Sequence, residues 1–157
     1  MKRTALFAGS FDPYTNGHHS LVRKAAGLFD EVVILIGVNV RKSRHTDADA
    51  MKAAIEQTLR DDGLANVSVV TYTGMIADYC AEHDIHWYVR GIRNHLDYNY
   101  EENIAEVNKL INPAMESVYF RSDNVAVSSS MVKELHSFGL DVSPYLPKAV
   151  YDILQSE

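Results

Sequence analysis

The residues of this sequence best suited to chemistry lie in a loop between its first apolar run and its first helical pattern. The loop begins with Ser10 and Phe11, and Gly17 and His18 stand where the helix would start. A strand, a tight loop and a helix N-terminus together offer backbone N–H groups and the positive end of the helix dipole to a phosphate. Gly17 leaves room for a ligand against the backbone, and His18 would project toward it. The glycine fingerprints of dinucleotide-binding and Walker loops are absent from the sequence, so the pattern predicts a phosphate site of another kind.

Further cations and serines follow the other apolar runs. They are Arg41, Lys42 and Arg44 after the second run, Arg90 and Arg93 after the fourth, and Ser128, Ser129 and Ser130 at the start of a later helix. Ligands of open α/β sheets gather beyond the carboxyl ends of the strands, so these groups and His18 are expected to form one polyphosphate site. Each group alone has a plainer explanation: a solvated loop, a helix cap, or an arginine paired with a nearby carboxylate. Their convergence on one sheet edge favours the phosphate site.

The elements that must position these groups alternate along the chain. We expect strands at Thr4–Ala8, Val32–Val38, Val67–Tyr72, Trp87–Val89 and Ser117–Phe120, and helices at Gly17–Phe29, Asp47–Asp62, Met75–His83, Tyr98–Ile111 and Met131–Phe138. This alternation predicts a Rossmann-like, doubly wound α/β fold, with a parallel five-stranded sheet and helices on both faces. Thr46 is expected to cap the second helix, and Ser143-Pro144 to begin a C-terminal helical stretch.

The composition narrows the class of protein. The 157 residues suit a single domain, 1–157, and a net charge of −6 disfavours nucleic-acid binding, which needs a basic face. No apolar run approaches the roughly 20 residues of a membrane span, and Ser10 and Asp12 interrupt the first apolar run, so neither a membrane segment nor a signal peptide is expected. The single cysteine, Cys80, cannot form an internal disulfide and suits a cytoplasmic location.

Two motifs carry a resemblance to the (H/T)-x-G-H nucleotidyltransferases. The first is Gly9-Ser10-Phe11-Asp12-Pro13 with Thr15-Asn16-Gly17-His18, and the second, more specific one is Val127-Ser128-Ser129-Ser130 with Val132-Lys133-Glu134. Within that superfamily the chain is most similar, over essentially its whole length, to the bacterial phosphopantetheine adenylyltransferases. The resemblance implies a nucleotidyltransferase fold and transfer of the adenylyl group of ATP to 4′-phosphopantetheine, which gives dephospho-coenzyme A and pyrophosphate.

The resemblance also implies a role for individual residues. His18 matches the histidine that stabilises the transition state at the α-phosphate of ATP, and Lys42 matches the lysine that binds the phosphates of both substrates. The implied nucleotide-binding set is Ser10, Phe11, His18, Gly91, Ile92, Arg93, Glu101, Asn124, Val125, Ala126, Val127, Ser128, Ser129 and Ser130. The implied acceptor-binding set is Ser10, Lys42, Ile76 and Arg90. Ile76 also fits the core face of a helix with Met75, Tyr79 and Cys80, which is the reading we favour.

The family also implies Mg²⁺ carried mainly by the phosphates of ATP, with no metal ligand assigned to the protein, and a homo-oligomer that is a hexamer. Three departures from the family pattern leave the adenine contacts and feedback regulation open. No proline stands beside Lys42, Ala48-Asp49-Ala50 replaces a Glu-Glu-Arg run, and Asn124-Val125-Ala126 replaces an aromatic residue.

Two alternative functions are compatible with the same residues. One is another adenylyl- or cytidylyltransferase, although cytidylyltransferases typically carry Arg-Thr-x-Gly-Ile-Ser-Thr where this chain has Val127-Ser128-Ser129-Ser130. The other is a non-catalytic nucleotide sensor, which the intact His18 and Lys42 disfavour. His19 lies about 100° around the helix from His18, so its loss is expected to be close to neutral.

Overall fold

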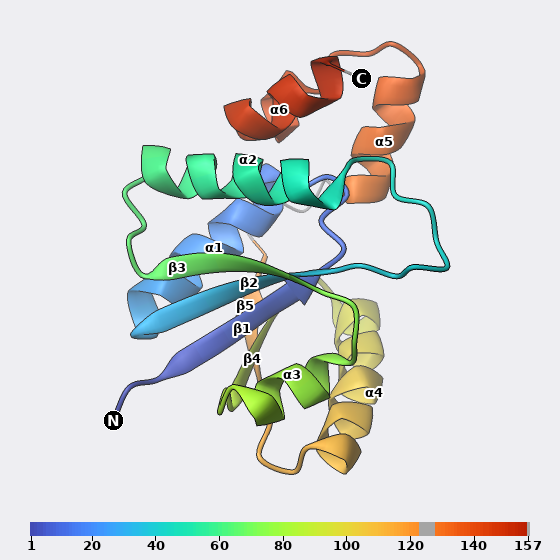
Figure 1. Ribbon diagram of the computed structural model, residues 1–157. Coiled ribbons are helices and arrows are strands. Elements are labelled where there is room, and N and C mark those ends of the chain that lie inside the picture. Colours follow the sequence, from blue (N-terminus) through green and yellow to red (C-terminus); the bar gives the residue numbers. More distant parts are fainter. Residues whose placement is uncertain (123–127, 157) are drawn as a thin grey trace.

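The computed structural model describes residues 1–122 and 128–156, which form alternating strands and helices (Figure 1). The strands are β1 Thr4–Gly9, β2 Glu31–Gly37, β3 Val67–Tyr72, β4 Trp87–Ile92 and β5 Glu116–Arg121. The helices are α1 Asn16–Leu28, α2 Ala48–Asp61, α3 Ile76–Glu82, α4 His95–Ile111, α5 Ser129–Ser137 and α6 Lys148–Gln155, with a 3₁₀ turn at Ser143–Tyr145 before α6.

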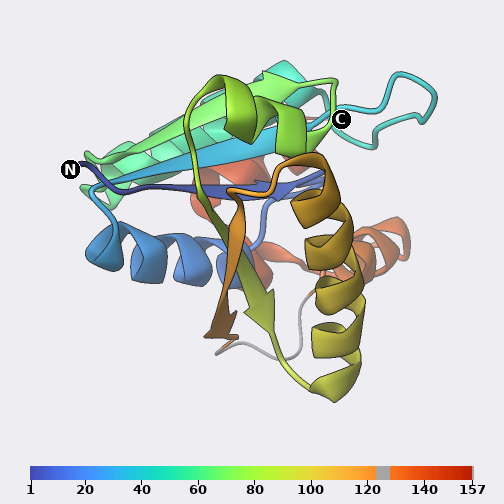
Figure 2. The same ribbon diagram turned by 90° about the horizontal axis from the view of Figure 1, so that it is seen from below.

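The five strands form one parallel sheet in the order β3-β2-β1-β4-β5. Helices α1, α2, α5 and α6 lie on one face of the sheet, and α3 and α4 lie on the other (Figures 1 and 2). The predicted doubly wound α/β fold is therefore confirmed. The strand order reverses between β1 and β4, which opens a crevice beyond their carboxyl ends, the usual place for a ligand in such sheets.

Strand β2 shows how the sequence specifies a sheet covered on both faces. Its apolar run is continuous, and Ile34, Leu35 and Ile36 are at most 1% exposed. Because side chains alternate along a strand, Ile34 and Ile36 join the core beneath α1, α2 and α6, whereas Leu35 joins the core beneath α3. Among the described residues, no helix is both long and apolar enough to cross a bilayer.

Two predicted boundaries are wrong in ways that matter for the site. Strand β4 continues to Ile92 instead of ending at Val89, so Arg90 lies within the strand rather than in the loop after it. Helix α4 begins at His95 instead of Tyr98, because the side chain of Asn94 accepts a backbone N–H of the first turn at 3.0 Å and caps the helix there.

The predicted cap of α2, Thr46, is also wrong. Asp47 is the N-cap, and its carboxylate accepts the N–H of Ala50 at 2.9 Å. Thr46 is buried and instead donates its backbone N–H and its hydroxyl to the carboxylate of Asp12, at 2.8 and 2.6 Å. The turn after β1 is thereby attached to the loop before α2, 34 residues further along the chain.

Candidate active site

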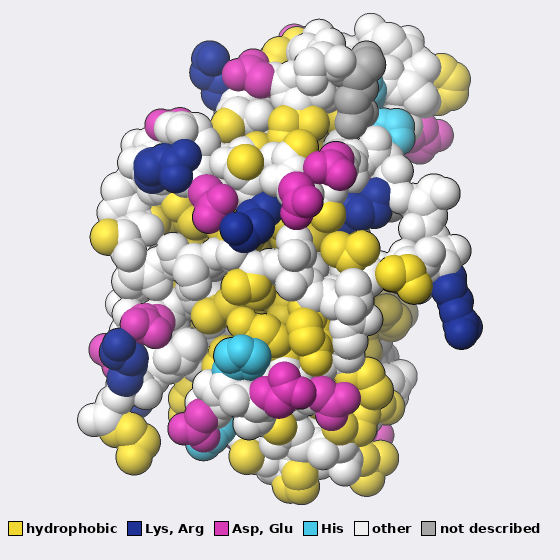
Figure 3. All heavy atoms as spheres, viewed as in Figure 1, with side chains coloured by type: hydrophobic (Ala, Val, Ile, Leu, Met, Phe, Trp, Pro, Cys, Tyr) yellow, Lys and Arg dark blue, Asp and Glu magenta, His cyan; other side chains and the backbone are white. Residues whose placement is uncertain are grey.

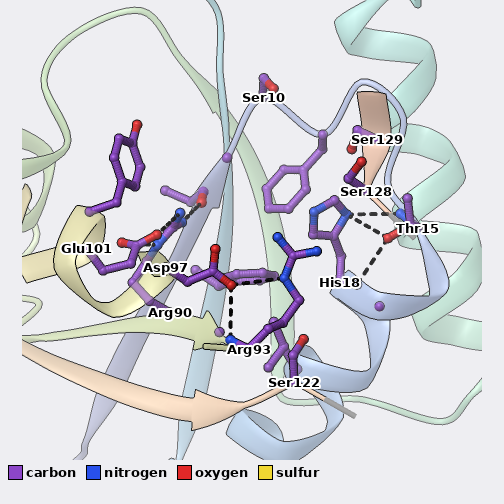
Figure 4. Close-up of a pocket in the computed structure, with 18 residues that line it drawn as sticks. Ser10, Thr15, His18, Arg90, Arg93, Asp97, Glu101, Ser122, Ser128 and Ser129 are labelled. Atoms are coloured by element: carbon purple, nitrogen blue, oxygen red, sulfur yellow. Dashed lines mark hydrogen bonds and ion pairs between the residues drawn. The ribbon is translucent and has the colours of Figure 1, made fainter. Parts of the chain in front are cut away.

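A pocket of about 410 Å³ opens at the carboxyl ends of β1 and β4, where the strand order reverses (Figure 4). The turn after β1, the first turns of α1 and α5, and the end of β4 with the start of α4 form its walls. Its polar lining residues are Ser10, Thr15, His18, Arg90, Arg93, Asp97, Tyr100, Glu101, Ser122, Ser128 and Ser129. Segments that are far apart in the sequence thus contribute to one concave site.

His18 is held in a fixed orientation by the cap of its own helix. Thr15 is the N-cap of α1: its side chain accepts the N–H of His18, and its own backbone N–H donates to Nδ1 of the imidazole at 3.0 Å. Because Nδ1 accepts this hydrogen bond, the proton of the neutral ring lies on Nε2. Figure 4 shows the ring with Nδ1 toward Thr15 and its other nitrogen directed into the pocket.

The surroundings of His18 keep its ring neutral. The ring of Phe11 meets the imidazole edge-on with centroids 5.0 Å apart, and the ring of Tyr14 stacks on it at 5.7 Å. Burial, assisted by the positive charge of Arg90, lowers the pKa of His18 from its usual 6.5 to about 4. At neutral pH the imidazole is therefore an uncharged donor, which offers Nε2–H to a ligand in the pocket.

Arg90 is fixed at the back of the pocket by a two-pronged ion pair. Its Nε and one terminal nitrogen donate to the two carboxylate oxygens of Glu101, both at 2.9 Å, and the other terminal nitrogen donates to the carbonyl of Ala8 at 2.6 Å. Glu101 is only 6% exposed. Burial alone would lower the pKa of Arg90, but nearby Tyr88 and Glu101 raise it. Arg90 is therefore a permanent cation, and its ion pair with Glu101 of α4 holds it at the pocket.

Arg93 presents a second cation at the mouth of the same pocket. Its Nε donates to a carboxylate oxygen of Asp97 at 3.0 Å, and the same oxygen accepts its backbone N–H at 3.1 Å. These hydrogen bonds lower the pKa of Asp97. Figure 4 shows the guanidinium of Arg93 on the side of the pocket that faces His18. The two arginines and the imidazole therefore line one pocket, a suitable arrangement for an anion with several phosphates.

Helix α5 brings serines to the opposite wall. Its N-cap, Ser128, accepts the N–H of Met131 at 3.1 Å, and the hydroxyl of Ser129 donates to the carbonyl of Pro13 at 2.7 Å. The second contact attaches α5 to the turn after β1. Consequently the N-terminus of α5, with its positive dipole end, lies beside the first turn of α1.

Most of the predicted site residues line this one pocket. Those found in its lining are Ser10, Phe11, His18, Arg90, Gly91, Arg93, Glu101, Ser128 and Ser129. Ile92 and Ser130 are not in the lining, and Ser130 is exposed on α5. Asn124, Val125, Ala126 and Val127 lie outside the described residues. Ile76, at the start of α3, packs partly buried against the core with Tyr79 and Cys80, as the core interpretation predicted. The same interpretation was wrong for Met75, which is the N-cap of α3 and is 51% exposed.

Lys42 does not reach the pocket in this structure. It is exposed in the loop between β2 and α2, where its backbone N–H donates to the carbonyl of Asn39 at 3.0 Å. Figure 3 shows a cationic side chain standing away from the body of the molecule at the position of this loop in Figure 1. The cation of this loop that does approach the turn after β1 is Arg44, whose role the sequence did not reveal.

Asp97 and Tyr100 belong to the pocket although they were not predicted as site residues. For Asp97 a signal existed, because it stands four residues after Arg93, the spacing of an ion pair on one helical turn. The two carboxylates that the described residues bring to the pocket, those of Asp97 and Glu101, are bound to arginines. In the described part of the chain no group of three or more His, Cys, Asp or Glu side chains could hold a metal ion. The described part of the lining therefore offers no cluster of unpaired carboxylates to a metal ion.

Comparison with known proteins agrees with the geometry. Residues 6–135 match the family model described as cytidylyltransferase-like. The chain is 42% identical over 154 residues to a phosphopantetheine adenylyltransferase of Nocardioides sp., covering 97% of this chain and 95% of that protein. It is 37% identical to a phosphopantetheine adenylyltransferase of Cytophaga hutchinsonii, covering 94% and 98% of the two chains.

A solved structure shares the fold. It is described as a "Putative Nicotinate-nucleotide Adenylyltransferase" from Vibrio parahaemolyticus, and it superposes with a TM-score of 0.74 over 99% of this chain and 93% of that one, at 18% identity. At that identity the likeness concerns the fold alone. The sequence relatives, matched over nearly their whole length, show that the chain belongs to the phosphopantetheine adenylyltransferase family of nucleotidyltransferases.

Proposed function

We propose that this enzyme transfers the adenylyl group of ATP to 4′-phosphopantetheine, giving dephospho-coenzyme A and pyrophosphate, the penultimate step of coenzyme A biosynthesis. The observation that carries the proposal is the juxtaposition of a neutral Nε2–H donor on His18 with two carboxylate-anchored arginines, Arg90 and Arg93, in one pocket. Such a site is suited to binding several phosphates at once. The sequence relatives of the chain carry the name of this activity.

The chemistry requires positioning and charge stabilisation rather than a base. An oxygen of the acceptor phosphate forms a bond to the α-phosphorus of ATP, and the bond from that phosphorus to the bridging oxygen breaks. Pyrophosphate leaves with the electron pair, and because the attacking phosphate is already ionised, no proton has to be removed from it. The site therefore has to align two anions and stabilise charge as it shifts.

The pocket residues have separate tasks in this scheme. Nε2–H of His18 would donate to an α-phosphate oxygen, strengthened by the N-terminus of α1. Arg90 would hold the acceptor phosphate, and Arg93 with the N-terminus of α5 would hold the departing pyrophosphate. The role expected for Lys42 requires the loop between β2 and α2 to carry its exposed side chain to the phosphates.

Further features of the enzyme follow as proposals. Mg²⁺ would enter with ATP and be held chiefly by phosphate oxygens, since Asp97 and Glu101, the carboxylates among the described lining residues, are bound to arginines. We also propose a cytoplasmic location and a homo-oligomer, with the hexamer as the expected form.

A turnover assay tests the reaction directly. The protein is incubated with ATP or CTP and with 4′-phosphopantetheine or a mononucleotide acceptor, and both pyrophosphate and the nucleotide product are measured. We expect turnover only with the pair ATP and 4′-phosphopantetheine, and dephospho-coenzyme A as its product. Comparable turnover with CTP, or with a mononucleotide acceptor, would assign the enzyme to another branch of the superfamily. Binding of ATP without any turnover would favour the sensor.

A further inference from the structure

Arg44 belongs to the loop between β2 and α2, and its side chain lies against the turn that follows β1. It is largely buried, with 15% of the side chain exposed. Its two terminal nitrogens donate to successive backbone carbonyls, those of Ser10 at 2.6 Å and Phe11 at 3.2 Å. Its Nε donates to the carbonyl of Thr46 at 2.9 Å. One guanidinium thus joins the turn that borders the pocket to the loop that precedes α2.

These contacts fix the direction of two peptide groups. The peptide bonds after Ser10 and after Phe11 are trans, so the N–H of each points away from its carbonyl. Since both carbonyls point at Arg44, the N–H groups of Phe11 and Asp12 both point away from it. Two successive N–H groups directed to one side form a concave anion-binding feature of the kind that cradles phosphates.

The conformation that produces this cradle needs external support. Phe11 has a φ of 45°, a left-handed conformation that bulky residues rarely adopt and that persists only where the surroundings impose it. Arg44 supplies one restraint through the carbonyls. The carboxylate of Asp12 supplies another by accepting the backbone N–H groups of His45 and Thr46, each at 2.8 Å.

We propose that Arg44 is a positioning residue, which holds the N–H groups of Phe11 and Asp12 toward the phosphates of the nucleotide. This inference rests on the proposed function for the identity of the anion, and it gives Arg44 no direct contact with substrate. It differs from a simple attraction between a cation and ATP. Attraction requires only the positive charge. The grip of Arg44 on the carbonyls of Ser10 and Phe11, which we call the clamp, requires donors on two nitrogens held in one plane, which arginine has and lysine lacks.

The test compares three variants, and each is measured well below its unfolding midpoint. Arg44→Met removes both the charge and the fork, and Arg44→Lys keeps the charge without the fork. Arg60→Gln is the control, because it removes an arginine from the exposed surface of α2. Affinity for inorganic pyrophosphate is measured by calorimetry, and kcat and KM are measured for ATP and for 4′-phosphopantetheine.

Both Arg44 variants should lose at least about tenfold in pyrophosphate affinity and in kcat/KM for ATP, because small misplacements of binding groups are costly. The KM for 4′-phosphopantetheine should change less. Arg60→Gln should stay within about twofold of wild type, as surface substitutions usually do. If Arg44→Lys matched wild type, charge alone would explain Arg44. If both variants lowered the unfolding midpoint but bound pyrophosphate normally, Arg44 would be a structural residue only, and either result overturns the proposal.

The outcome is separable from that of the proposed function. Pyrophosphate binding needs no acceptor, so the expected pattern of affinities in a protein that makes no dephospho-coenzyme A would overturn the function and support the clamp. Normal turnover by wild type together with normal pyrophosphate affinity in both Arg44 variants would support the function and overturn the clamp. A wild-type protein that turned over ATP but bound no pyrophosphate would also overturn the clamp.

Discussion

The two ring nitrogens of His18 have different tasks, and this separation makes the residue testable. Nδ1 accepts the N–H of Thr15 at 3.0 Å and so belongs to the helix cap, whereas Nε2 carries the proton that faces the pocket. A substitution that removes the whole ring would disturb both tasks together. Two shorter amides separate them, because asparagine can place an oxygen near Nδ1 and glutamine can place an N–H donor near Nε2.

His18→Asn should keep the fold and bind ATP within a few-fold of wild type, but lose about 10²–10³ in kcat, the usual cost of one transition-state donor. His18→Gln should retain more of kcat because it restores a donor at the Nε2 position. Steady-state kinetics and calorimetry with ATP measure these effects. If ATP binding were abolished in His18→Asn, the contact would belong to the ground state and the assigned role would be wrong.

The lowered pKa of His18 also predicts how stability depends on pH. The folded pKa is about 4, against an ordinary value of 6.5, so between these values the unfolded chain binds more protons than the folded protein. Stability must therefore fall as the pH drops from 6.5 toward 4. Burial likewise lowers the pKa of His19, although its hydrogen bond to Asp62 opposes the shift. Urea unfolding across this range should show a shallower pH dependence for His18→Asn, and an unchanged slope would contradict a His18 that stays neutral in the folded protein.

His19 makes buried contacts that the sequence did not indicate, so its expected neutrality applies to catalysis and not to stability. It is 7% exposed, and its ring contacts the hydroxyl of Tyr14 and the carboxylate of Asp62, both at 2.9 Å. Asp62 also accepts from Arg23, so the chain of contacts joins α1 to the end of α2. The sequence alone could not show this, since helical geometry gives the direction of His19 but not what packs there.

His19→Ala should destabilise the protein by about 1–3 kcal/mol, because it leaves the buried hydroxyl of Tyr14 without its partner. Its kcat should remain close to wild type where the variant is folded. Arg23→Ala is the matched control, since it removes an exposed partner of the same carboxylate and should cost no more than about 1 kcal/mol. Denaturant unfolding measures both values, and equal costs for the two variants would show that the buried contacts of His19 contribute little.

At the scale of elements, Gly91 permits β4 and α1 to pack closely beneath the pocket. A Cβ at this position would lie 2.5 Å from Cδ1 and 3.1 Å from Cδ2 of Leu21, a side chain that is itself 6% exposed. Leu21 must therefore move, or α1 must shift and carry His18 with it. Gly27, on the exposed end of the same helix, has nothing within 4 Å of such a Cβ.

Gly91→Ala should cost about 1–3 kcal/mol through overpacking and should lower kcat as well, because the displaced helix carries His18. Gly27→Ala should instead stabilise the protein by about 0.5–1 kcal/mol, the ordinary gain in a helix. A double-mutant cycle with Leu21→Ala tests the cause. We expect the penalty of Gly91→Ala to shrink when Leu21 is absent, and strict additivity of the two substitutions would contradict the proposed contact.

The element pattern was predictable because the strongest signals are local. Continuous apolar runs such as β2, and alternation of strand and helix, require a parallel sheet covered on both faces, and the structure has it. The choice of helix cap was not predictable in the same way. Thr46 and Asp47 are both good caps, and Asp12, 34 residues away in sequence, decides between them by binding Thr46.

The candidate site likewise has a part that the sequence predicts and a part that it does not. His18, Arg90 and Arg93 were predicted together because each follows or begins an element at the carboxyl edge of the sheet, and all three line one pocket. The contacts of Arg44 were not foreseen, since they depend on two backbone carbonyls that lie 34 and 33 residues earlier in the chain. Lys42 was predicted at the site by the same argument and by resemblance, and in this structure it remains exposed on its loop. Side-chain partners across the fold, rather than element identity, were the unpredicted part.

At the scale of the whole molecule, α4 exposes more apolar surface than a solvated helix needs. Leu96, Tyr100, Val107 and Leu110 are between 52% and 84% exposed, and they recur at intervals of three, four and seven residues, as on one side of a helix. The adjoining side of the helix packs against the core through Ile104 and holds the buried residues Glu101 and Asn108. Contiguous apolar surface of this kind usually marks an interaction site, and a second copy of the chain fits the proposed homo-oligomer.

Charges placed in this stripe should therefore separate the subunits. We expect wild type to sediment as a species several times larger than the 17.6 kDa chain at micromolar concentration. Val107→Glu combined with Leu110→Glu should shift the mass toward the monomer, because the interface would have to bury two like charges that cannot pair with each other. Leu28→Lys is the control: Leu28 is 61% exposed at the end of α1, away from the stripe, and the charge should leave the mass unchanged. A wild-type protein that sedimented only as the monomer would refute the oligomer, whereas an unchanged mass in the doubly charged variant would move the interface to another surface.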